Sequence, residues 1–263
     1  MGADDIFAPM PVLKAAGHSV NYEWIEGDAG RPPLVFLHEG LGSIRQWRDF
    51  PARLAAATGC RALVYDRYGY GQSDVLAEPR RSVRFMHDEA LEALPQILDA
   101  LKIKNPILVG HSDGASIALI HAGAWHPVRG VVAMAPHVFI EPICLSSIRT
   151  ATVTFENTDL AEKLARYHRD ARKTFYGWAD VWLDPQFKRW DIRDDYLPNV
   201  RCPILAIQGH DDEYGTMAQL DDIALRVSVA CELLKLEDCG HSPFRDQPEK
   251  VLSAAKDFID SVS

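Results

Sequence analysis

The sequence lacks both the long apolar segments of a membrane protein and the basic excess of a nucleic-acid binder. No run approaches the ~20 apolar residues that a membrane-spanning helix needs. The 28 Lys and Arg are outnumbered by 37 Asp and Glu, which gives a formal net charge of -9. Because phosphates must be neutralised by a basic face, we expect neither nucleic acid nor membrane as a partner. Residues 1–10 are acidic and lack an apolar core, so they predict no secretory signal, and we expect a cytoplasmic protein.

Motifs for metals, disulfides and dinucleotides are also missing. The five cysteines are odd in number and form no C-x-x-C, which argues against a disulfide framework or a zinc site and favours thiols in a reducing compartment. No H-E-x-x-H is present. The two G-x-G segments have Arg45 and Asp74 where a dinucleotide-binding loop needs its third glycine. We therefore expect no metal and no cofactor.

Short apolar runs alternate with amphipathic stretches along most of the 263 residues, which can form one unit. Strands are predicted within 33–40, 61–71, 106–112, 129–136, 202–212 and 231–241, and helices within 44–59, 82–103, 113–126, 216–227 and 247–261. Apolar strands separated by helices predict an α/β fold whose mostly parallel central sheet is flanked by helices. Residues 19–27 alternate in polarity and predict an antiparallel edge strand, and Pro95 predicts a kink.

One region breaks this alternation. Residues 140–197 contain no convincing buried strand, but they hold helical patterns dense in aromatic residues. We expect them to form a helical cap inserted into a core made of residues 1–139 and 198–263. Most of the aromatics should pack the cap, and one or two should line a pocket. The aromatics in question are Tyr167, Phe175, Tyr176, Trp178, Trp182, Phe187 and Trp190.

The segment 110–114, Gly-His-Ser-Asp-Gly, places Ser112 between a predicted strand and a predicted helix. A sharp strand-to-helix turn exposes such a serine as a nucleophile, and its weak hydroxyl needs a base. His241 is the candidate base, because it lies in a polar loop after the last predicted strand. Asp212, preferred to the adjacent Asp211, ends the strand before it. The chain order of serine, aspartate and histidine suits this chemistry.

These motifs resemble the α/β-hydrolase superfamily, in its small capped serine hydrolase branch. The resemblance covers nearly the whole chain from about residue 18 and is carried, in order, by LHEGLGS, DRYGYGQSD, GHSDG, GHDD and CGHSP. It implies an α/β-hydrolase fold, a catalytic triad of Ser112, His241 and Asp212, and an oxyanion hole. The resemblance implies that the backbone N–H groups of Asp113 and Gly40 are the oxyanion donors. The turn DRYGYGQSD is structural in this family.

Two nearby residues are candidate substrate contacts. Glu39 departs from the family pattern, because it occupies a position where relatives usually have glycine. A carboxylate aimed at an oxyanion would repel it, so we expect Glu39 to point away in a structural role or to recognise a donor or cation on the substrate. Trp47 is expected either to wall the acyl pocket or to pack the core.

Three functions are compatible with this pattern. The first is hydrolysis of a small carboxylic ester or thioester through an acyl-enzyme, with a small acyl molecule as partner. The second is cleavage of a carbon–carbon bond or a cofactor-free dioxygenase reaction on the same scaffold, where serine only assists in the dioxygenase case. The third is ligand sensing by a binding protein that retains the triad. A homo-oligomer is compatible with the sequence, which does not identify the substrate.

Overall fold

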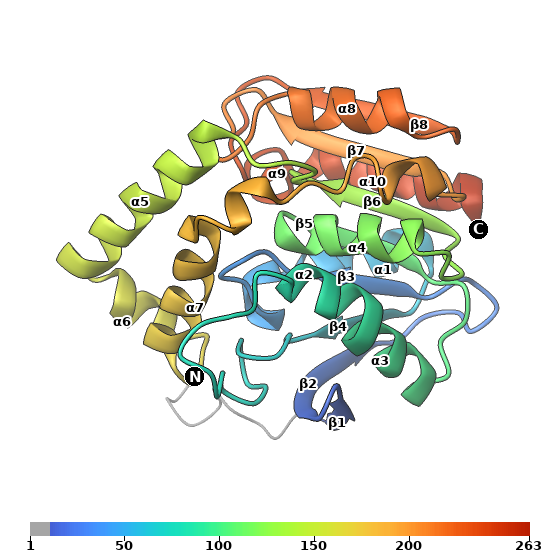
Figure 1. The fold of residues 1–263 in the computed structure, drawn as a ribbon. Coiled ribbons are helices and arrows are strands. Elements are labelled where there is room, and N and C mark those ends of the chain that lie inside the picture. Colours follow the sequence, from blue (N-terminus) through green and yellow to red (C-terminus); the bar gives the residue numbers. More distant parts are fainter. Residues whose placement is uncertain (1–10) are drawn as a thin grey trace.

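The computed structural model describes residues 11–263, so the predictions for residues 1–10 lie outside the described part. Its strands form a single eight-stranded sheet in the order β1-β2-β4-β3-β5-β6-β7-β8 (Figure 1). They are β1 (Val12–Ala15), β2 (His18–Ile25), β3 (Leu34–Leu37), β4 (Ala62–Tyr65), β5 (Ile107–His111), β6 (Gly130–Met134), β7 (Ile204–Gly209) and β8 (Cys231–Leu236). β1 pairs with β2 in antiparallel orientation, and β2 pairs with β4 in the same way. All neighbouring pairs among β3 to β8 are parallel. The predicted fold class is confirmed.

Helices cover both faces of the sheet because successive strand residues point to opposite sides. In β3, for example, Leu34 and Phe36 pack with α1 and α10, whereas Val35 and Leu37 pack with α3 and α4. The first face carries α1 (Phe50–Thr58), α9 (Pro243–Asp246) and α10 (Pro248–Val262). The second carries α2 (Phe85–Asp88), the π-helical segment η3 (Glu89–Ala93), α3 (Leu94–Ala100), α4 (Asp113–Gly123) and α8 (Ala218–Arg226).

Two predicted helices are interrupted. The helix expected over 44–59 divides into a 3₁₀ turn, η2 (Ile44–Trp47), and α1, because Arg48 between them has φ of 56°. It does end at Gly59, whose φ of 70° closes the helix as predicted. In the helix expected over 82–103, η3 replaces a simple kink just before Pro95. Since proline has no N–H to donate, the preceding turn widens to the π form.

One prediction about the strands was wrong. β2 is not an edge strand, because the four-residue β1 pairs with it and forms the edge. Such a short strand offers too little pattern to be found in the sequence. At the other edge, β8 is not buried throughout, and Leu233 is 37% exposed. An edge strand has one neighbour and incomplete cover, which its apolar composition does not reveal.

The segment between β6 and β7 is helical and stands at one end of the sheet. It contains α5 (Pro142–Asn157), α6 (Leu160–Ala165), α7 (Ala171–Leu183) and the 3₁₀ turns η4 (Phe187–Arg189) and η5 (Leu197–Asn199). α5, α6 and α7 contact one another and lie on the left of Figure 1, the side toward which the arrowheads of β6 and β7 point. No helix within residues 11–263 is long and apolar enough to span a bilayer.

Candidate active site

Ser112 lies at the sharp turn between β5 and α4. Its backbone has φ of 53° and ψ of -120°, a conformation that costs a residue other than glycine on the order of 1–3 kcal/mol. A Cβ added to Gly110 would lie 2.5 Å from the Cα of Ala115, and one added to Gly114 would lie 1.9 Å from the carbonyl oxygen of Leu37. The turn therefore requires glycine on both sides of the serine.

Three side chains from distant segments meet at this turn. His241, in the loop between β8 and α9, has Nε2 2.9 Å from Ser112 Oγ and Nδ1 2.8 Å from Asp212 Oδ1. A carboxylate only accepts hydrogen bonds, so the ring proton belongs on Nδ1, and Nε2 is free to accept from the hydroxyl. The arrangement can remove a proton from Ser112 and transfer it to a leaving group.

The aspartate is fixed by several donors. Oδ1 of Asp212 also accepts from the N–H of Tyr214 at 2.8 Å, and Oδ2 accepts from Gln208 Nε2 at 3.2 Å. Asp212 is buried, whereas the adjacent Asp211 is exposed to solvent. The structure therefore brings Asp212, and not Asp211, to the imidazole of His241.

Burial and charge act in opposite directions on this pair. Burial alone would lower the pKa of His241, but the charge and hydrogen bond of Asp212 outweigh it, and the pKa is raised. Burial also opposes ionisation of Asp212, yet the neighbouring imidazole lowers the pKa of that carboxyl. The carboxylate thus stays charged and can stabilise the imidazolium that forms when the ring accepts a proton.

The loop after β3 borders the same site. Arg67 Nη2 donates to the carbonyl oxygens of His38 and Glu39 at 3.1 and 2.9 Å, which fixes the orientation of both peptide units. Within residues 11–263 the N–H of Gly40 has no hydrogen-bond acceptor. Asp113 begins α4, where N–H groups have no acceptor inside the helix. Both residues border the cavity beside Ser112, so both N–H groups are candidate donors to an oxyanion.

That cavity has a volume of about 170 Å³. Trp178 and Trp182 of α7 close it from the helical segment, so these two are the aromatics of residues 140–197 that line it. A Cβ on Gly40 would lie 2.1 Å from Trp178 Nε1, which shows how closely the indole covers the loop. The complete lining is Glu39, Gly40, Leu41, Ser112, Asp113, His137, Cys144, Ile148, Trp178, Trp182, Tyr214 and His241.

The rings of His137 and Tyr214 also belong to the cavity wall, and neither was singled out from the sequence. The His137 ring lies 5.9 Å from that of His241 and 5.0 Å from that of Trp182, and burial lowers its pKa to about 3. The Tyr214 ring lies 4.7 Å from that of His241. His137 follows β6, the neighbour of β5, so its place at the carboxyl end of a parallel strand was the available signal.

Trp47 is placed elsewhere. It is 1% exposed, packs against Phe36, Phe50 and Phe244, and does not line the cavity. The acyl-pocket role suggested for it is therefore wrong, and Trp47 belongs to the core beneath the sheet, the other alternative left open by the sequence.

The two acidic side chains beside Ser112 are each near cations. Burial opposes ionisation of Glu39, but the adjacent His111 and Arg245 hold its pKa well below the usual range. Burial raises the pKa of Asp113 to about 6, although Arg67 and Arg81 favour its charged form. These cations limit the repulsion that two nearby carboxylates would exert on an oxyanion.

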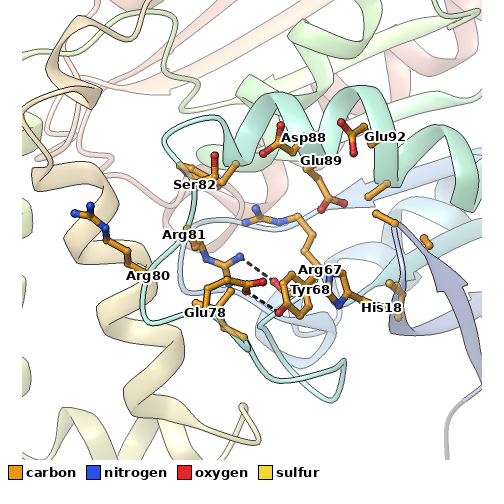
Figure 2. Close-up of a pocket in the computed structure, with 16 residues that line it drawn as sticks. His18, Arg67, Tyr68, Glu78, Arg80, Arg81, Ser82, Asp88, Glu89 and Glu92 are labelled. Atoms are coloured by element: carbon orange, nitrogen blue, oxygen red, sulfur yellow. Dashed lines mark hydrogen bonds between the residues drawn. The ribbon is translucent and has the colours of Figure 1, made fainter.

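A larger cavity of about 400 Å³ lies away from the three side chains described above. Figure 2 shows Arg67 and Arg81 among its lining residues, with Asp88, Glu89 and Glu92 along the helical segment beside them. Neither Ser112 nor His241 borders it, so size alone does not identify the candidate site. Among residues 11–263, no three His, Cys, Asp or Glu side chains are grouped to hold a metal ion.

Comparisons with known proteins identify the family of this chain. Residues 34–255 match the profile of the alpha/beta hydrolase family. A proline iminopeptidase of Lactobacillus helveticus is 31% identical over 93% of this chain and 95% of its own length. A 3-oxoadipate enol-lactonase of Acinetobacter baylyi is 25% identical over 90% and 92%. A solved meta-cleavage product hydrolase of Pseudomonas fluorescens superposes with a TM-score of 0.75 at 18% identity, over 96% of this chain and 98% of that one.

Proposed function

Because this chain belongs to the alpha/beta hydrolase family, we propose that it is a serine hydrolase that cleaves a small carboxylic ester or thioester through an acyl-enzyme. The observation that carries the proposal is the continuous hydrogen-bonded row from Ser112 Oγ through His241 to Asp212, with spacings of 2.9 and 2.8 Å. These distances suit a nucleophile, its base and the group that orients the base. The relatives are hydrolases, which supports the reaction class.

In the proposed reaction, Ser112 Oγ attacks the acyl carbon while its proton moves to Nε2 of His241. The tetrahedral intermediate collapses when the imidazolium gives that proton to the departing alcohol or thiol. A water molecule then attacks the acyl-enzyme, with His241 again accepting the proton, and releases the carboxylic acid and the free serine. Asp212 stays ionised throughout and stabilises the imidazolium.

The N–H groups of Gly40 and Asp113 form the proposed oxyanion hole. The carbonyl oxygens of the Gly40 loop are held by Arg67, which supports an orientation of the loop N–H groups toward the cavity. Removal of one donor of this kind typically lowers the rate by ~10²–10³-fold.

The cavity supports a small acyl group. A buried void of ~150 Å³ can hold a benzene ring, so about 170 Å³ suits a single ring or a short chain. In this proposal residues 140–197 act as a cap, since Trp178 and Trp182 close the cavity above Ser112.

The proposal is tested with a substrate panel on the wild type and on Ser112→Ala. The panel holds acetyl, butyryl, octanoyl and benzoyl aryl esters, the matching thioesters and a prolyl arylamide. We expect turnover of the short or benzoyl substrates and a loss of about 10⁴-fold or more in the variant. Dioxygen uptake with a ring substrate, retained in Ser112→Ala, would favour the dioxygenase alternative. Saturable ligand binding without product over hours would favour a binding protein.

A further inference from the structure

Glu39 points into a buried ionic contact, although it borders the cavity. Its Oε2 lies 3.5 Å from Nδ1 of His111, and Oε1 lies 3.8 Å from Nη2 of Arg245. The His111 side chain is 1% exposed and that of Glu39 is 17% exposed. Only glycine at position 42 leaves room for this orientation, because a Cβ there would lie 2.3 Å from Glu39 Oε2.

The other nitrogen of the same imidazole meets the backbone of the proposed base. His111 Nε2 lies 2.7 Å from the carbonyl oxygen of His241. A carbonyl accepts hydrogen bonds only, so this contact places a ring proton on Nε2, while Nδ1 faces the Glu39 carboxylate.

Side chains from several elements surround the His111 ring. They are Glu39 from the loop after β3, Phe244 from α9, His241 from the loop before α9, and Trp47 from η2. Arg245 lies 3.8 Å from Glu39, and its cation favours a charged carboxylate there. Glu39 is thus the one carboxylate in contact with His111 among the described residues.

His111 joins three parts of the site that are distant in the sequence. It directly precedes Ser112, its Nδ1 faces the loop that contributes Gly40, and its Nε2 fixes the main chain of His241. The side chain of His241 is oriented by Asp212, but its distance to Ser112 also depends on where its backbone lies. A loop that carries a reacting group is held precisely only when such outer contacts support it.

We propose that Glu39 and His111 are positioning residues, which hold the main chain of His241 at reacting distance from Ser112. This inference rests on the proposed function and assigns Glu39 to the support of the base and not to substrate binding. Because the pair acts through His241, its loss should lower kcat and leave KM nearly unchanged.

The test compares Glu39→Gln, His111→Gln and the double variant, using kcat, KM and the rate of fluorophosphonate labelling of Ser112. We expect each single variant to lose about 10–100-fold in kcat and labelling rate, as is typical for such supporting contacts. KM should change less than twofold, and the double variant should be no worse than His111→Gln. The matched control is Glu237→Gln, which disrupts an exposed Glu–His contact of 3.4 Å with His210 and should match the wild type.

Histidine ring ¹⁵N NMR provides a readout that does not depend on activity. The wild type should show His111 with a proton on Nε2, and Glu39→Gln should weaken the hydrogen bond of that proton to the His241 carbonyl oxygen. A wild-type ring without a proton on Nε2 would overturn the inference even if the variants failed to fold. Normal labelling of Glu39→Gln beside a labelled wild type would contradict this inference alone, whereas an unlabelled wild type would contradict the proposed function.

Discussion

Replacement of Asp212 by asparagine tests how the proposed base is activated. The imidazolium and the carboxylate are two charges about 4 Å apart in a buried site, and at an effective dielectric constant of about 20 their attraction is about 4 kcal/mol. Loss of that attraction in the transition state corresponds to about 10³-fold in rate. In addition, both carboxylate oxygens of Asp212 accept hydrogen bonds, from His241, from the Tyr214 N–H and from Gln208. The NH₂ group of the new asparagine would therefore face another donor in either orientation of its amide. Stabilisation of the wrong His241 tautomer brings the expected loss in kcat to about 10³–10⁴-fold.

The pH profile distinguishes this effect from a general disturbance of the site. Only neutral His241 accepts the proton, so wild-type activity should fall as the pH drops through the raised pKa of His241. In Asp212→Asn the carboxylate that raises this pKa is gone, whereas burial still lowers it. The acidic limb of the pH–activity profile should therefore move to lower pH. The assay is steady-state ester hydrolysis between pH 4.5 and 9. Asp211→Asn, which alters the exposed neighbour, is the control. The reasoning is refuted if Asp212→Asn keeps more than a tenth of the activity, or if Asp211→Asn loses as much.

Three further predictions concern packing, pH stability and acyl size. Gly114→Ala should lower the free energy of unfolding by about 3 kcal/mol in a urea titration, because its Cβ meets a carbonyl oxygen; equal loss in the exposed Gly30→Ala would contradict this. Burial lowers the pKa of His168 to about 4. Between pH 6.5 and 4 the unfolded chain therefore binds more protons than the folded protein, and the free energy of unfolding decreases as the pH is lowered. At pH 5 His168 should have lowered the free energy of unfolding by on the order of 2 kcal/mol. His168→Gln should remove this loss, and an unchanged dependence of stability on pH in that variant would refute the prediction. Trp182→Leu should shift kcat/KM about tenfold in favour of longer acyl esters. Trp190→Leu is the control, because Trp190 does not line the cavity, and it should cause no such shift. If Trp182→Leu causes no shift, Trp182 does not limit the length of the acyl group.

The parts of the fold that follow from local pattern were predictable from the sequence. Apolar strands and amphipathic helices predicted the parallel sheet, and the glycines of residues 110–114 predicted the turn at Ser112. The edges were not predictable, since β1 is only four residues long and the exposure of β8 depends on which neighbours it has. Pro95 signalled a disturbance in its helix, but not that the helix would widen to the π form.

In the candidate site, too, local motifs were predictable from the sequence, whereas contacts between distant segments were not. Its motifs identified the residues at the carboxyl ends of the strands, because a parallel sheet places these ends together. The contact of His111 with the His241 carbonyl joins residues 130 positions apart, and no local pattern encodes it. Trp47 was ambiguous because an aromatic residue after a strand suits a pocket wall and a core equally well, and only packing against Phe244 distinguishes the two.

The most direct test of the central claim is covalent labelling of the proposed nucleophile. A fluorophosphonate probe is incubated with the wild type, Ser112→Ala and His241→Gln, and the modified peptide is mapped by mass spectrometry. The account predicts one adduct on Ser112 in the wild type, none in Ser112→Ala, and at least 10²-fold slower labelling in His241→Gln. A folded wild type that shows no adduct on Ser112, or labels as fast without His241, would contradict it.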